Sequence, residues 1–189
     1  MNTPAHLIVG VAAFGKPDAP RVTGAALAGA MLPDLSLYVM VGVSIYLLGI
    51  EPRVVFREYY YSDAWQQVFA VDNSFVLWGG LLALGLCYRH AALIACAGAA
   101  CLHLAFDFPL HNHDARMHFW PVSSWVFESP LSYWDSRHYG ESIGLLEVAV
   151  SLLLCALLLL RFRKLLMRAG IALLAAAETF ASGIWHFIF

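Results

Sequence analysis

The stretch CLHLAFDFPLHNHDARMHFWP, residues 101–121, joins the end of a long apolar run to a segment rich in histidine. It contains four histidines and two aspartates, whereas the chain as a whole is 61% hydrophobic and only 13% charged. A soluble domain would carry about a quarter charged residues, so this composition is typical of a membrane protein. The stretch therefore places ionisable side chains where an apolar helix is expected to end.

Apolar runs that approach or exceed the length needed to cross about 30 Å of hydrocarbon recur along the chain. A short run covers residues 5–15, and longer ones cover 22–49, 74–88, 91–107, 142–160 and 165–188. We predict an all-α membrane bundle forming one domain over residues 1–189, with about five transmembrane helices and a short N-terminal helix. Pro33 removes a backbone donor from the second run, which predicts a kink or a break beside Asp34.

Basic side chains are concentrated in the short connections between these runs, at Lys16, Arg21, Arg89, Arg161, Arg163, Lys164 and Arg168. By the positive-inside rule those connections are cytoplasmic. Segments 50–73 and 108–141, which contain many aromatic residues, then face the periplasm, or the exterior if the cell has one membrane. No basic run indicates nucleic-acid binding.

Ionisable or amide side chains from several runs fall at a similar predicted depth, about 15–27 Å above the cytoplasmic boundary at 1.5 Å per helical residue. Each ionised group in hydrocarbon costs roughly 2.5–3.5 kcal/mol, so a shared cation or an aqueous cavity would explain why they coincide. The alternative is a set of buried hydrogen bonds between helices. The residues are His6, Asp34, Asp72, Asn73, His103, Asp107, Glu147 and Glu178.

His103 and Asp107 are four residues apart, so a helix places both on one face, as a metal site requires. Pro109 should end that helix, and the following loop brings three more histidines, of which His113 is the favoured ligand. Nitrogen and oxygen donors suit zinc best, with manganese or iron as alternatives. The predicted metal ligands are His6, Asp34, His103, Asp107 and His113, with His103 and Asp107 also catalytic. Further candidates are Asp72, Asn73, His111, His118 and Glu147, whereas His90 and His186 are expected to lie outside the site.

Two aromatic segments, REYYYSDAWQQVF (57–69) and FWPVSSWVFESPLSYW (119–134), have the tryptophan and tyrosine content expected at lipid headgroup level. They either anchor the protein at the interface or admit a lipid or small-molecule substrate from the outer leaflet. The oligomeric state is left open.

Four short motifs in this order, TPAHLIVG (3–10), GAMLPDLSLY (29–38), HLAFDFPLHNH (103–113) and FWPVS (119–123), resemble the YdjM-like predicted membrane-bound metal-dependent hydrolases. The likeness covers roughly residues 1–160 and implies a bacterial inner-membrane protein. With the orientation that the basic connections indicate, the site is expected toward the periplasm. That group is similar to zinc-dependent phospholipase C, whose helical zinc site carries HxxxD with another histidine six residues after the aspartate. His103, Asp107 and His113 match that spacing, and His6 and Asp34 match the upstream ligands.

The chain departs from this pattern where relatives carry a histidine followed by serine, because DNS occupies positions 72–74. Asn73 then replaces a ligand, with Asp72 as a substitute, and the downstream HxxxE is shortened between His138 and Glu141. Similar sequences are sometimes labelled cobalamin-biosynthesis proteins, but no nucleotide-binding loop or amidotransferase nucleophile supports that chemistry here.

Three functions follow from these observations. The first is a membrane-bound metal-dependent hydrolase of a lipid or phosphoester substrate. The second is a non-catalytic protein whose metal site is structural, senses an ion or conducts one, although a carrier often has an internal repeat and none is found. The third is a scaffold in which the polar groups only bridge helices.

Overall fold

The computed structural model describes the backbone of residues 1–188 and the side chains of residues 1–183, so the side chain of His186 lies outside the described part. Within it the chain is helical and has no strand, which confirms the predicted all-α class. The main helices are α1 (Thr3–Phe14), α2 (Pro20–Gly42), α4 (Asp63–Asp72), α5 (Phe75–Cys87), α6 (Ala91–Asp107), α7 (Gly140–Arg161) and α8 (Leu165–Ile188). Shorter elements are the π-helical η1 (Val43–Leu47) and η2 (Val55–Tyr59), α3 (Pro52–Val54) and η3 (Ser136–His138).

Four helical segments in the described residues are long and apolar enough to cross a membrane: Pro20–Leu47, Asp63–Cys87, Gly140–Arg161 and Leu165–Gly183. The count is close to the five predicted, and the difference lies in α6, which is apolar but only 17 residues long. The span before it is longer than predicted, because α4 continues the apolar stretch of α5 into the segment 50–73, which the sequence predicted to lie outside the membrane. The chain thus has the construction of a multi-pass membrane protein.

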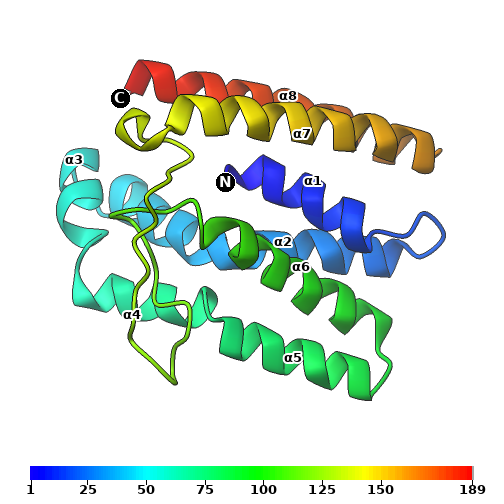
Figure 1. Cartoon of the computed structure of the whole chain (residues 1–189), viewed down its shortest axis with the longest axis horizontal. Helices are drawn as coiled ribbons and strands as arrows, with labels where there is room; N and C mark the ends of the chain where they lie inside the picture. The colour runs from blue at the N-terminus through cyan, green and yellow to red at the C-terminus, as the bar shows by residue number, and fades with distance from the viewer. Residues whose placement is uncertain (189) are drawn as a thin grey trace.

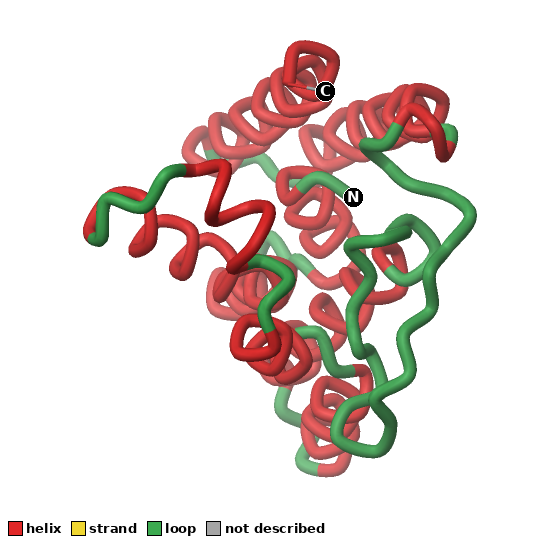
Figure 2. Tube along the Cα trace, turned by 90° about the vertical axis from the view of Figure 1, so that its left-hand side faces the viewer, coloured by secondary structure: helices red, strands yellow, loops and turns green. Residues whose placement is uncertain are grey.

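Helix α1 is the centre of the bundle. It lies between the pair α2 and α6 and the pair α7 and α8, and it contacts all four helices (Figure 1). Helix α5 packs against α6 on the side away from α1 (Figure 1). Figure 2 shows the long loop after α6 crossing one end of the bundle before the chain enters α7. The first turn of α1 and the end of α6 therefore meet beneath that loop.

Small residues allow the central helices to approach closely. Gly29 of α2 faces the main chain of Cys96 in α6, and a Cβ at that position would collide with the Cys96 carbonyl. Gly10 of α1 lies against the Ala30 side chain, whose Cβ would be 2.8 Å from a Cβ added at position 10. Close contact through small residues is the usual means by which helices associate in lipid, where apolar burial supplies little driving force.

Helix α2 is not broken at Pro33, although the sequence predicted a kink or a break there. The proline lacks the N–H that would reach the carbonyl four residues earlier. Neighbouring segments contact other carbonyls close to it, since His103 Nδ1 lies 2.8 Å from the Ala30 carbonyl and Asn73 Nδ2 lies 3.2 Å from the Pro33 carbonyl. Proline is tolerated inside membrane helices that are packed among neighbouring helices. The helix thus continues through Pro33 and carries Asp34 to the first turn of α1.

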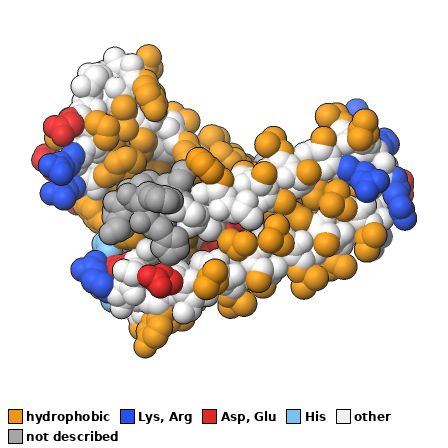
Figure 3. Space-filling view, turned by 90° about the horizontal axis from the view of Figure 1, so that it is seen from above, with side chains coloured by type: hydrophobic (Ala, Val, Ile, Leu, Met, Phe, Trp, Pro, Cys, Tyr) orange, Lys and Arg blue, Asp and Glu red, His pale blue; other side chains and the backbone are white. Residues whose placement is uncertain are grey.

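The surface of the molecule is largely apolar between two charged ends. In Figure 3 hydrophobic side chains spread along the length of the visible face, and lysine and arginine side chains lie at both its left-hand and its right-hand end. The α1–α2, α5–α6 and α7–α8 turns lie at the right-hand end in Figure 1. On α7 the side chains of Leu145, Leu153 and Leu160 are 61–74% exposed, as suits a helix that faces lipid.

Candidate metal centre

Two histidines and an aspartate form a buried group where α1 meets α6. Helix α1 supplies His6 in its first turn, and α6 supplies His103 and Asp107 one turn apart near its end. The imidazole rings of His6 and His103 are stacked, with centroids 3.5 Å apart and planes within 9°. One donor atom from each of the three residues lies within 4.8 Å of the others, so the group is able to hold one cation.

Asp107 is the hub of this group. Its Oδ1 lies 2.9 Å from His6 Nε2 and 2.6 Å from the amino nitrogen of Met1. Its Oδ2 lies 3.1 Å from His103 Nε2 and 3.5 Å from His111 Nε2. A single buried carboxylate therefore faces three imidazoles, two from apolar helices and one from the loop.

The orientation of His103 is fixed by α2. Its Nδ1 lies 2.8 Å from the Ala30 carbonyl, and because a carbonyl oxygen only accepts, Nδ1 carries the proton. In the neutral ring Nε2 then presents a lone pair, which faces Asp107 Oδ2 at 3.1 Å and Asp34 Oδ1 at 3.6 Å. Nε2 is buried and has no hydrogen bond among the described residues. A lone pair that faces two carboxylate oxygens needs a positive charge between them, either a proton or a metal ion.

The donor atoms lie slightly closer together than a bound zinc ion would hold them. Zinc bonds of about 2.0–2.2 Å at tetrahedral angles hold two donor atoms roughly 3.3–3.6 Å apart. Asp107 lies 2.9 Å from His6 and 3.1 Å from His103, so these pairs would separate by a few tenths of an ångström around an ion, whereas the His111–Asp107 and His103–Asp34 separations of 3.5 and 3.6 Å already fall in that range. In metal sites a backbone carbonyl often holds the second nitrogen of a ligating histidine, and the Ala30 carbonyl holds His103 Nδ1 in the same manner.

Asp34 lies beside the cluster. Its Oδ1 is the oxygen near His103, and its Oδ2 accepts a hydrogen bond of 2.5 Å from the Thr3 hydroxyl. Thr3 Oγ1 also lies 2.6 Å from the Tyr38 hydroxyl. These two hydroxyls hold the carboxylate on the side of α2 that faces α1.

The structure brings together only some of the predicted site residues. His6, Asp34, His103 and Asp107 meet, whereas His113 is exposed and its ring packs edge-on against Trp134. The loop turns so that His111 rather than His113 approaches Asp107. The catalytic and metal-binding roles assigned to all these residues remain predictions.

The further candidates are divided between the cavity and other parts of the bundle. Asn73 donates through Nδ2 to the Pro33 and Phe69 carbonyls, so that nitrogen is committed to the backbone. Asp72 lies beside Ser36 and is not part of the cluster. Glu147 accepts a 2.6 Å hydrogen bond from the Asn2 main-chain nitrogen and lies next to Glu178. His118 lines the cavity described next.

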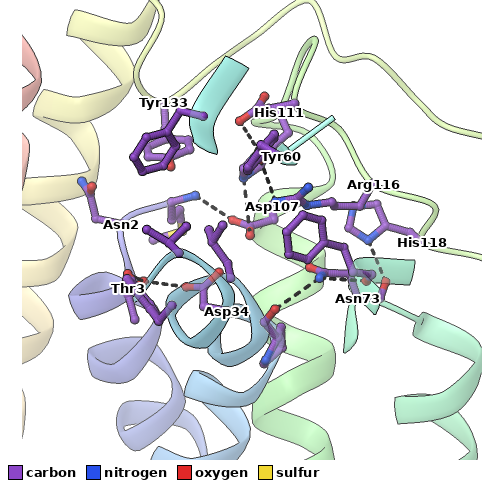
Figure 4. Close-up of a pocket in the computed structure, with 18 residues that line it drawn as sticks. Asn2, Thr3, Asp34, Tyr60, Asn73, Asp107, His111, Arg116, His118 and Tyr133 are labelled. Atoms are coloured by element: carbon purple, nitrogen blue, oxygen red, sulfur yellow. Dashed lines mark hydrogen bonds and ion pairs between the residues drawn. The ribbon is translucent and has the colours of Figure 1, made fainter. Parts of the chain in front are cut away.

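A cavity of about 260 Å³ opens beside Asp107, and Figure 4 shows the side chains that surround it. Its polar wall contains residues that we did not single out from the sequence, among them Tyr60, Asp114, Arg116 and Tyr133. The available signal was the sequence HNHDARMH, in which Asp114 and Arg116 alternate with the histidines. The other lining residues are Met1, Asn2, Thr3, Pro33, Asp34, Leu37, Tyr38, Val41, Phe56, Phe69, Asn73, Asp107, His111 and His118.

The loop residues at the cavity have strongly shifted protonation equilibria. Burial alone would lower the pKa of His111, but the carboxylates of Asp107 and Asp114 raise this pKa to about 9. Burial likewise opposes ionisation of Asp114, yet the His111 imidazole and its hydrogen bond keep the pKa of this carboxyl well below its usual range. Burial lowers the pKa of His118 to about 4, so this ring is neutral near neutral pH.

His118 resembles His103 in the way it is held. Its Nδ1 lies 3.0 Å from the main-chain oxygen of Asn73, which fixes the proton on Nδ1 and leaves the Nε2 lone pair of the neutral ring available. Phe75 and Phe108 contact the ring. The cavity wall thus carries a second oriented imidazole besides the metal candidates.

Comparison of the chain with protein-family models, with curated proteins and with solved structures gave no match. The site must therefore be interpreted from its own geometry.

Proposed function

We propose that this chain is a membrane-embedded metal-dependent hydrolase. One divalent cation, zinc in the first instance and manganese or iron as alternatives, would be held by His6, His103 and Asp107, with Asp34 and His111 beside it. The observation that carries the proposal is the buried Nε2 of His103, which faces two carboxylates while its Nδ1 is committed to the Ala30 carbonyl. The resemblance to the YdjM-like group points in the same direction.

The proposed reaction is hydrolysis of a phosphoester that enters the cavity beside Asp107. A bound divalent cation would polarise the phosphoryl oxygen and acidify a coordinated water. Hydrolysis forms one bond from phosphorus to the water oxygen and breaks the bond to the alcohol oxygen, which takes up a water proton. Of the chain's own groups, Thr3 and Tyr38 hold Asp34 toward the cluster, and the apolar helices keep bulk water from His6 and His103.

We also propose the orientation that the basic connections indicate. The α1–α2, α5–α6 and α7–α8 turns, which contain Lys16, Arg89 and Arg161, would face the cytoplasm of a bacterial inner membrane. The cluster lies at the other end of α6, next to the long loop, and would then open toward the periplasm. A substrate in the outer leaflet would reach it without crossing the bundle.

A structural metal site is the second candidate, and the packing of the cluster favours it. His6, Asp34 and His103 join three different helices, and Asn73, which occupies the position of an expected ligand, hydrogen-bonds to backbone carbonyls. A cation at this junction would then stabilise the bundle without taking part in a reaction.

The deciding experiment is elemental analysis of metal in the detergent-purified protein, with wild type compared with the double variant His103→Ala/Asp107→Ala. We expect about one equivalent of zinc or manganese in wild type and almost none in the double variant, because the variant removes two of three clustered ligands. Hydrolysis of a chromogenic phosphodiester should fall with the metal. Metal binding without any hydrolysis would favour the structural alternative.

The matched control is His90→Asn. His90 is exposed at the start of α6, where its Nδ1 accepts a hydrogen bond of 3.1 Å from the Leu93 nitrogen, and asparagine retains an N-cap acceptor. This variant should hold as much metal as wild type. No metal in wild type, even after reconstitution with zinc and with manganese, would refute the proposed function.

A further inference from the structure

Arg116 is a buried arginine in the wall of the cavity that holds Asp107. It is only 8% exposed, although it belongs to the loop and not to a helix. Its Nη2 donates a 2.7 Å hydrogen bond to the Tyr60 hydroxyl, and its Cζ lies 4.0 Å from the centre of the Phe69 ring and 4.7 Å from that of Tyr60. Two aromatic rings thus hold the guanidinium in one position, as Figure 4 shows for Tyr60.

The guanidinium has unused hydrogen-bonding capacity. Within residues 1–183 Arg116 forms no ion pair with a carboxylate, and its Nη1 is buried without a hydrogen-bond partner. The nearby acid, Asp114, acts on it only through space. Asp114 Oδ2 is engaged by His111 Nδ1 at 2.8 Å and Trp134 Nε1 at 3.0 Å, and Asp114 Oδ1 is buried without a hydrogen bond to Arg116 or to any other described residue. A buried guanidinium nitrogen that lacks an acceptor is unfavourable, so a ligand that supplies an acceptor to Nη1 would be bound favourably.

We propose that Arg116 binds a phosphoryl oxygen of a ligand in this cavity. The planar fork of a guanidinium matches the oxygens of a phosphoryl group, and it binds most strongly where water is excluded. The lining beyond the polar groups includes Leu37, Val41 and Phe56, which suits the organic part of a phosphate ester. For the reaction this inference rests on the proposed function, whose substrate class it specifies, but binding through Arg116 does not require the metal.

The test is binding of inorganic phosphate to the purified full-length protein, measured by calorimetry with and without zinc. We expect Arg116→Gln to weaken phosphate binding at least about tenfold in both conditions, because the variant loses a charged bidentate donor. Zinc content should stay at the wild-type value, and Arg116→Lys should show intermediate affinity. Equal phosphate affinity in Arg116→Gln and wild type, or no phosphate binding to wild type, would overturn the inference while leaving the metal result unaffected.

The matched control is Arg57→Gln, which removes an exposed arginine from the aromatic segment 57–69 and should leave phosphate binding unchanged. Equal thermal unfolding of the two variants would show that loss of binding is not loss of fold. A short-chain phosphatidic acid, compared with inorganic phosphate, distinguishes the two sources of the phosphoryl group. Tighter binding of the lipid would assign the subsite to a headgroup, and equal binding would assign it to a soluble phosphate, with Arg116 required in either case.

Discussion

Two clusters of buried polar groups flank the start of α1, and they differ in composition. The metal candidate lies toward α2 and α6, whereas a pair of glutamates, Glu147 of α7 and Glu178 of α8, lies on the other side. In this acid pair Glu147 Oε1 accepts from the Asn2 main-chain nitrogen at 2.6 Å, and Glu178 Oε1 accepts from the Ser182 hydroxyl at 3.2 Å. Residues near the start of α1 thus connect both pairs of helices.

The comparison shows that depth in the membrane did not by itself identify a site. Both clusters fall in the layer that the sequence predicted, but only the first combines imidazole lone pairs with carboxylates and borders the cavity that contains Asp107. Among the side chains of residues 1–183 no histidine lies beside the acid pair, which bonds to main-chain and hydroxyl donors, as expected of groups that hold helices together. We therefore expect metal chemistry at the first cluster and a packing role at the second.

The largest expected difference is between Asp107→Asn and Glu178→Gln, which each replace one carboxylate by an amide of the same shape. Asp107→Asn should weaken zinc binding by more than about 100-fold. Loss of a residue that only contacts a ligand weakens metal binding roughly 10–100-fold, and loss of a ligand itself should have a larger effect. Glu178→Gln should leave zinc affinity unchanged. Titration of metal-free protein with zinc measures both constants.

Either variant can contradict the comparison. Zinc affinity that survives in Asp107→Asn, or that falls in Glu178→Gln, would mean that the two clusters share a role or exchange roles. Thermal unfolding of both proteins provides the control, because a variant that unfolds at the wild-type temperature has lost binding and not structure.

The sequence predicted the helices well because membrane helices are encoded in long apolar runs. The run 91–107 coincides with α6, and 142–160 falls within Gly140–Arg161. The spacing of His103 and Asp107 also predicted that both lie on one face of the helix. The positions of the basic connections predicted a similar depth for His6 and Asp34. These features depend on helical periodicity, which is local and regular.

The loop could not be predicted in the same way. Its path depends on long-range contacts, such as the 2.9 Å hydrogen bond from the Ser129 nitrogen to the His111 carbonyl. A periodic pattern in the sequence does not predict such contacts. Six-residue spacing therefore favoured His113, while the folded loop brings His111 to Asp107 and buries Arg116. The apolar runs also did not show that the polar residues form two separate clusters, the metal candidate and the acid pair. That separation depends on which side of α1 each helix packs.

A smaller effect should separate the two neighbouring loop histidines. His111 Nε2 lies 3.5 Å from Asp107 Oδ2, whereas His113 is exposed and stacks edge-on against Trp134. His111→Ala should weaken zinc binding about 10–100-fold, as loss of a partner to a ligand does, and His113→Ala should leave it unchanged. The same zinc titration reports both, and a loss of affinity only in His113→Ala would restore the spacing-based prediction and refute the role of His111.

The smallest expected effect concerns His118, the neutral imidazole on the cavity side of the comparison. Burial lowers the pKa of His118 to about 4, below the ordinary value of 6.5, so as pH falls the unfolded chain takes up this proton before the folded one does. The contribution of His118 to the free energy of unfolding is therefore complete above about pH 6.5 and is lost progressively as pH falls toward 4.

His118→Asn keeps a donor for the Asn73 carbonyl but removes the titrating group. The free energy of unfolding of the metal-free protein should then fall less between neutral pH and about pH 5, by roughly 1–2 kcal/mol. His113→Asn, which alters an exposed ring, should retain the wild-type pH dependence in the same thermal unfolding measurement. Equal pH dependence in His118→Asn and wild type would show that this ring is as well solvated as that of His113, and the cavity would then lack the dry wall that distinguishes it from the protein surface.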